Sequence, residues 1–133
     1  MQVKTDSKYA CTNTFKMKNA LNRFAYAVKG VIVFFREGTH AKFHLLASVI
    51  AVTAGVFFHI TFIEWIAVVL CIGMVLAAEM LNTAIELLGD FVHKEQHPLI
   101  GKIKDISAGA VLFAALAAGI TGCIIFIPYI LKL

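Results

Sequence analysis

The sequence predicts an all-α membrane protein in which an amphipathic surface helix precedes three transmembrane helices. Of its 133 residues, 60% are hydrophobic and only 15% are charged, whereas soluble domains lie nearer to one half and one quarter. A chain this short cannot bury so much apolar surface in a water-soluble core. Its length allows one domain at most.

The N-terminal part is expected to lie at the membrane surface. Residues 1–12 are polar and are expected to form a disordered tail, and residues 13–133 are expected to form a single membrane-embedded domain. The first helix, 14–38, places apolar residues at helical spacing with lysine and arginine between them, a pattern typical of a helix in the interface. The alternative is a core helix of a soluble domain, but little sequence remains to form one.

The transmembrane helices are expected at about 41–60, 62–92 and 106–131. Residues 45–63 and 106–131 contain no Asp, Glu, Lys or Arg, and a span needs about 20 apolar residues. The last run is also rich in alanine and glycine, which let helices approach closely in lipid.

The middle helix is expected to extend beyond the hydrocarbon. Only 14 uncharged residues separate Glu64 from Glu79, but the helical pattern continues to about Val92. A helix over 62–92 is about 46 Å long, so its second half should lie at or beyond the lipid headgroups.

The placement of basic residues predicts the orientation. Eight of the twelve Lys and Arg residues precede the run 45–63, three more lie in the connector 93–104, and only Lys132 lies on the other side. The positive-inside rule then places the N-terminus and the connector in the cytoplasm. The net charge of +4 therefore fits an anionic membrane surface better than nucleic acid.

Residues able to do chemistry gather in the second half of the middle helix. At about 100° per residue, Glu79, Thr83, Glu86 and Asp90 fall within roughly 40° of one line, and Asn82 flanks them at about 60°. A carboxylate in the membrane is costly without a partner, about 2.5–3.5 kcal/mol for an Asp at a helix centre. Something cationic is therefore expected beside this face.

Two kinds of cation could face these carboxylates. Oxygen ligands favour Mg²⁺, which usually also holds phosphates, so the face could bind a magnesium nucleotide. The alternative is a solvated helix end paired with Lys102 and Lys104. Lys104 could likewise neutralise phosphate charge or simply reach the interface. A soluble phosphate-binding loop is absent, because Gly101-Lys102 is followed by Ile103 and has no upstream glycine at the required spacing.

The polar residues occur in a recognisable order. The chain reads Glu79-x-x-Asn82-Thr83-Ala84-Ile85-Glu86-x-x-x-Asp90, then His97-Pro98-Leu99, then Lys104-Asp105-x-x-Ala108-Gly109-Ala110-Val111. From about Asn22 to Pro128 it resembles the prokaryotic diacylglycerol kinase / undecaprenol kinase family. The His-Pro-Leu connector and the Ile125–Pro128 ending look more like the undecaprenol kinase branch.

The resemblance implies an architecture and an activity. It implies a homotrimer whose subunits each have a surface helix and three spans, with active sites shared between neighbours. It also implies Mg²⁺-dependent transfer of the ATP γ-phosphoryl group to a lipid hydroxyl at the cytoplasmic face of the inner membrane. The acceptor, undecaprenol or diacylglycerol, stays open, because both present a primary hydroxyl on an apolar body.

The resemblance also assigns roles to residues. Glu79 resembles the general base, Asn82 a residue that orders the site, and Glu86 a Mg²⁺ ligand. The residues expected to hold the nucleotide are Asp90, Glu95, His97, Lys104 and Asp105, with Lys104 contacting phosphate. The family's second metal-binding glutamate falls at Gly38 here, and Glu37 is carried over in its place. The alternative from another class, a non-enzymatic assembly or ion-conducting protein, predicts no dependence on Asn82 or Lys104.

Overall fold

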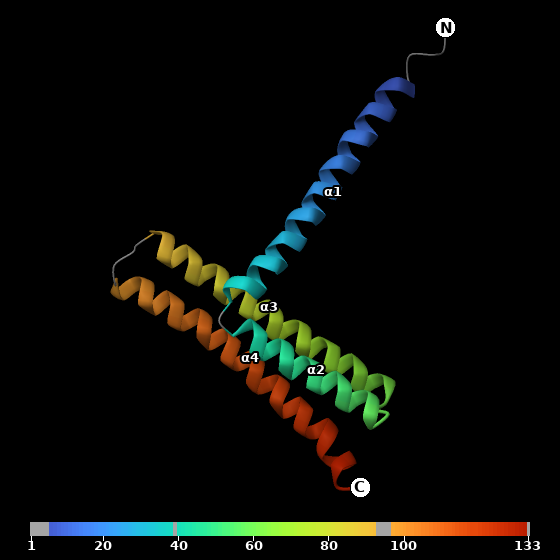
Figure 1. Cartoon of the computed structure of the whole chain (residues 1–133), viewed down its shortest axis with the longest axis vertical. Coiled ribbons are helices and arrows are strands. Elements are labelled where there is room, and N and C mark those ends of the chain that lie inside the picture. Colours follow the sequence, from blue (N-terminus) through green and yellow to red (C-terminus); the bar gives the residue numbers. More distant parts are fainter. Residues whose placement is uncertain (1–5, 39, 93–96, 133) are drawn as a thin grey trace. The chain divides into compact units, whose positions relative to one another are not determined.

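The computed structural model describes residues 6–38, 40–92 and 97–132, with side chains from residue 22 onward, and is all-helical over them. The element order is α1 (Asp6–Glu37), α2 (Ala41–Phe57), α3 (Phe62–Val92) and α4 (Pro98–Ile130) (Figure 1). The chain divides into two compact units, Met1–Arg36 and Glu37–Leu133. The all-α class is confirmed for this part of the chain.

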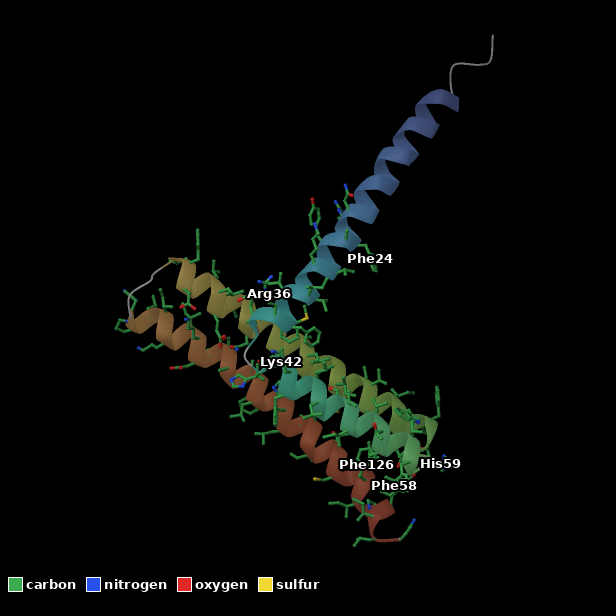
Figure 2. The ribbon with its side chains drawn as sticks, in the orientation of Figure 1. Phe24, Arg36, Lys42, Phe58, His59 and Phe126 are labelled. Atoms are coloured by element: carbon green, nitrogen blue, oxygen red, sulfur yellow. The ribbon has the colours of Figure 1, made fainter. Side chains whose placement is uncertain are left out.

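The first unit contains α1 up to Arg36. This helix begins at Asp6, before the expected start at Thr14, and ends at Glu37, next to Gly38. Its described portion exposes large apolar side chains, including Phe24 (Figure 2), together with basic ones. That α1 lies in a membrane interface stays a prediction.

The second unit is built around α3, which packs mainly against α4 and over a shorter stretch against α2 (Figure 1). Helix α3 has the bounds expected from the sequence, 62–92. Helix α2 ends at Phe57, slightly before the expected residue 60. Helix α4 begins at Pro98, ahead of the apolar run at 106, because His97 caps it and Pro98 suits the first helical turn.

A tight turn joins α2 to α3. His59 has φ 50°, the left-handed conformation that commonly ends helices. The His59 N–H donates to the Val56 carbonyl at 3.3 Å, and the Ile60 N–H donates to the Gly55 carbonyl at 3.2 Å. These two bonds form a Schellman motif, which satisfies carbonyls that the end of α2 would otherwise leave unpaired.

Reciprocal hydrogen bonds cap the start of α3. The Glu64 carboxylate accepts from the Thr61 N–H at 2.7 Å and from the Thr61 hydroxyl at 2.8 Å, which is close to a capping box. Tyr129 of α4 donates to the same Glu64 oxygen at 2.9 Å. This polar network therefore ties the start of α3 to the end of α4.

A small apolar core lies at the same end of the unit. It is formed by Ile60, Val68 and Ile125. Phe58 and Phe126, labelled in Figure 2, pack beside it with ring centroids 6.3 Å apart. This end of the unit is fixed by packing, whereas the opposite end of α3 carries the polar residues.

Among the described residues, two helices, α3 and α4, are long and apolar enough to cross a membrane. A third span is possible if residues 22–37 and α2 together form one broken span. The outward faces of α3 and α4 carry many exposed large apolar side chains, such as Leu70, Phe113 and Ile124. Such extensive apolar exposure suits lipid or other protein surfaces. The chain is thus a membrane protein by the length and composition of its helices.

Candidate active site

The N-terminal part of the polar face of α3, from Glu79 to Thr83, is buried. Glu79 is 2% exposed, Asn82 4% and Thr83 6%, and they continue the line of Val68 and Val75 that faces the other helices. No ion pair to the Glu79 carboxylate is found among the described residues. An ionisable group buried in a membrane helix is costly, and its presence marks a functional site more often than a structural one.

A hydrogen-bonded chain crosses from α3 to α4 one turn further on. The Asn82 side-chain amide donates to Glu86 Oε1 at 2.9 Å. The Ser107 hydroxyl of α4 donates to Asn82 Oδ1 at 2.6 Å and also lies 2.8 Å from the Lys104 carbonyl oxygen. The predicted ordering residue and the predicted metal ligand are therefore in direct contact.

The outer end of the polar face holds an ion pair. Lys104 Nζ lies 2.6 Å from Asp90 Oδ1, with side chains 30% and 69% exposed. Such a solvated pair contributes little to stability, so Lys104 can exchange Asp90 for another anion. The sequence allowed, as an alternative to a nucleotide site, a solvated helix end paired with Lys102 and Lys104. The ion pair between Lys104 and Asp90 agrees with part of that alternative.

A glycine makes room for this lysine. A Cβ atom at Gly89 would lie 2.9 Å from Lys104 Cε and 3.1 Å from Ile100 Cγ2. The Lys104 side chain therefore passes directly over the α3 backbone at a point where no side chain stands. Neither this role of Gly89 nor that of Ser107 was predicted from the sequence.

The remaining predicted residues are less closely associated with the cluster. Asp105 is exposed on α4, and Glu37 is exposed at the end of α1. His97 acts as the N-cap of α4, where its Nδ1 accepts from the Leu99 N–H at 3.3 Å. Glu95 lies outside the described residues. Over the described residues, no group of three or more His, Cys, Asp or Glu side chains could hold a metal ion.

An apolar cavity of about 330 Å³ lies beside the segment of α3 that precedes Glu79. It lies between α2, α3 and α4, and its α3 lining includes Val75, one turn before Glu79, while α4 contributes Ala118 and Gly122. Its lining is largely apolar, so it suits hydrocarbon better than a nucleotide.

Together these residues provide the groups needed for phosphoryl transfer. Glu79 can accept a proton, Glu86 offers a carboxylate oxygen to a cation, and Lys104 supplies a positive charge near the solvated end. Charge stabilisation and positioning account for most catalysis of phosphoryl transfer. Glu79 and Glu86 follow one another along α3, and Lys104 lies on the neighbouring helix α4.

Comparison with known proteins identifies a family and several relatives of this chain. The sequence pattern of the family described as prokaryotic diacylglycerol kinase matches residues 25–126. The chain is 36% identical over 115 residues to an undecaprenol kinase of Bacillus subtilis (strain 168), covering 84% of this chain and 94% of the relative.

Two diacylglycerol kinases are also similar. The one from Synechocystis sp. is 36% identical over 116 residues, covering 86% of this chain and 66% of the relative. The one from Escherichia coli (strain K12) is 28% identical over 113 residues, covering 85% and 93%. The extent of these matches shows that the chain belongs to the prokaryotic diacylglycerol kinase family.

Proposed function

We propose that this member of the family transfers the γ-phosphoryl group of ATP to the hydroxyl of a membrane lipid, either undecaprenol or diacylglycerol. The observation that carries the proposal is the buried Glu79 carboxylate, 2% exposed, which stands on the same helix face as Glu86 and Asp90. A purely structural carboxylate would be expected to have a cationic partner at such depth.

In the proposed reaction, the hydroxyl oxygen of the lipid attacks the γ-phosphorus, and Glu79 accepts the proton that this hydroxyl loses. A new P–O bond forms to the lipid, the bond between the γ-phosphorus and its bridging oxygen breaks, and ADP leaves. Lys104 exchanges Asp90 for a phosphate oxygen and offsets the charge that moves onto the leaving group. Asp90, Glu95, His97 and Asp105 are the proposed contacts to the nucleotide.

The residues present fit a magnesium ion. Mg²⁺ is commonly bound by one or two carboxylates together with substrate phosphates, so Glu86 with Glu37 would suffice without a third protein ligand. The Asn82 amide contacts only one Glu86 oxygen, Oε1. When bound, Mg²⁺ would neutralise phosphate charge and hold the γ-phosphoryl group in position.

The lipid would reach Glu79 from the hydrocarbon side. The cavity of about 330 Å³ lies beside the α3 segment that precedes Glu79, where an acyl or isoprenoid tail finds an apolar lining. The nucleotide would approach from the end of α3 at which Asp90 and Lys104 are solvated. Tail and nucleotide would then meet at the buried carboxylate.

The finer architecture belongs to the same proposal. We infer that α1 is an interfacial helix, that α2, α3 and α4 each span the inner membrane, and that the N-terminus is cytoplasmic. We also infer a homotrimer with shared sites. The exposed apolar faces of α3 and α4 and the basic residues near the N-terminus support these inferences.

The acceptor can be determined directly. Purified protein would be supplied with Mg²⁺, radiolabelled ATP and either undecaprenol or diacylglycerol in mixed micelles, and labelled lipid would be extracted and quantified. We expect ATP-dependent labelling of at least one lipid, and the ratio of kcat/KM values identifies the acceptor. No labelled lipid with either substrate, from protein that is folded and binds ATP, would contradict the proposal.

A further inference from the structure

The Ser107 hydroxyl occupies a buried position between two predicted site residues. Ser107 is 7% exposed, and its Oγ lies 2.6 Å from Asn82 Oδ1 on the opposing helix. It also lies 2.8 Å from the carbonyl oxygen of Lys104 in its own helix. One hydroxyl thus links the α3 residue that touches Glu86 to the α4 turn that carries Lys104.

The hydrogen bonds fix the direction of the Asn82 amide. A side-chain amide has a donor end and an acceptor end. The end facing Glu86 lies 2.9 Å from a carboxylate oxygen and must therefore be the N–H₂ donor, since an amide oxygen there would oppose a second acceptor. The amide oxygen then faces α4, where the Ser107 hydroxyl satisfies it.

Without Ser107, the amide oxygen would lose its partner in a buried place. Asn82 is only 4% exposed, and a buried acceptor without a hydrogen-bond donor destabilises the arrangement that leaves it unpaired. The side chain would be expected to rotate toward another donor, and the N–H bond to Glu86 would weaken with it. Loss of the Ser107 hydroxyl would therefore change the position of the Glu86 carboxylate, although Ser107 does not contact Glu86.

We propose that Ser107 is a positioning residue that acts through Asn82 to hold Glu86 with one carboxylate oxygen free for a divalent metal. In the part of the chain that the structure describes, Asn82 is the residue that bonds the Glu86 carboxylate, and it uses Oε1 alone. The other oxygen is left for the cation. This inference rests on the proposed function, in which Glu86 is a ligand of Mg²⁺.

The test measures metal binding without turnover. Mn²⁺, a paramagnetic substitute for Mg²⁺, would be titrated into the purified full chain with a non-hydrolysable ATP analogue, and free Mn²⁺ would be followed by electron paramagnetic resonance. Loss of outer-shell partners typically weakens metal binding about 10–100-fold. We expect Ser107→Ala to raise the Mn²⁺ dissociation constant about ten-fold and Ser107→Thr, which keeps the hydroxyl, to recover most of the affinity.

A matched control is available on α2. The Thr53 hydroxyl donates to the Val49 carbonyl one turn earlier at 2.8 Å, and Thr53 is exposed and away from the cluster. Thr53→Val should leave the Mn²⁺ dissociation constant unchanged. If Ser107→Ala does not fold, Ser107→Cys, with a weaker donor of similar shape, should show the same direction of change.

A double-mutant cycle separates positioning from general structural support. If Ser107 acts through Asn82, Ser107→Ala should weaken Mn²⁺ binding in the wild-type background and have almost no further effect in Asn82→Ala. Equal losses in both backgrounds, or unchanged binding in folded Ser107→Ala, would overturn the inference, as would wild-type protein that binds no Mn²⁺. Lipid labelling on the same samples tests the proposed function separately, since metal binding that depends on Ser107 could occur without transfer.

Discussion

Individual carboxylates on one face of α3 differ sharply in their surroundings. Glu79 is almost fully buried, Glu86 contacts the Asn82 amide, and the Asp90 side chain is 69% exposed beside Lys104. Residue type and spacing are similar, so the differences arise from depth along the helix and from what α4 places opposite. These differences suit three separate roles: proton acceptor, metal ligand and nucleotide contact.

Gly89 gives a test of how Lys104 is placed. We expect Gly89→Ala to displace the lysine, because the new Cβ would stand 2.9 Å from its Cε and 3.1 Å from Ile100. The lysine can move at modest cost, so folding should survive while kcat/KM for ATP falls about ten-fold, roughly 1.4 kcal/mol of transition-state stabilisation. Steady-state kinetics at varied ATP concentration measure this effect.

Gly101 provides the control for that substitution. It lies on α4 near the same end of the unit, and a Cβ there would meet nothing within 4 Å. Gly101→Ala should therefore leave the ATP kinetics unchanged. Equal kinetics for both variants would show that the space over Gly89 does not set the position of Lys104.

At the scale of whole elements, the sequence predicted helix bounds best where charge and hydropathy change together. Helix α3 was predicted at its observed bounds because Glu64 marks its start and the periodic pattern continues through the carboxylates. The start of α4 was missed because three charged residues, Lys102, Lys104 and Asp105, separate residues 98–101 from the uncharged run that begins at 106. The His97 cap and Pro98 nevertheless begin the helix there.

The candidate site was predictable only in part. The α3 residues were found from their shared face, which depends on helical period alone. Ser107 was not identified as a site residue, because its contact with Asn82 depends on the register between two antiparallel helices. The two helices approach closely at Gly89, and a single sequence does not reveal which residues of two helices lie opposite each other.

Gly55 at the end of α2 tests the packing that holds the three-helix unit together. A Cβ at Gly55 would lie 2.9 Å from the Trp65 ring and 3.1 Å from Ile60, and these groups belong to or adjoin the apolar core. Overpacking of this kind typically costs about 1–3 kcal/mol. We expect Gly55→Ala to lower the thermal unfolding temperature in detergent.

The matched substitution is Gly73→Ala on α3, where an added Cβ meets nothing within 4 Å. Because alanine favours a helix over glycine by about 1 kcal/mol, this variant should be at least as stable as wild type. A Gly55→Ala protein as stable as Gly73→Ala would contradict the packing described for the α2–α3 turn.

At the scale of the whole molecule, the placement of Lys104 bears on the shared sites proposed for the trimer. Within one chain its ammonium pairs with Asp90, about three helical turns or roughly 16 Å along α3 from Glu79. Sharing a site between neighbouring subunits would let the Glu79 of one copy and the Lys104 of another serve the same phosphoryl group.

Mixed trimers test this sharing. Glu79→Gln and Lys104→Met subunits, each nearly inactive alone, would be unfolded together, refolded and assayed. We expect partial recovery of lipid phosphorylation, because some mixed assemblies would contain one site with both native residues. Activity no higher than that of the separate variants would mean that both residues of a site come from one chain.

The most direct test of the central claim is lipid phosphorylation by Glu79→Gln in a bilayer, with ATP affinity and thermal stability measured on the same protein. General-base catalysis typically contributes about 10²–10⁴-fold to the rate. We predict that turnover falls by about that factor, while ATP binding and folding are retained. A folded Glu79→Gln protein that binds ATP and keeps most of its turnover would contradict the assignment of Glu79 as the group that accepts the lipid's proton.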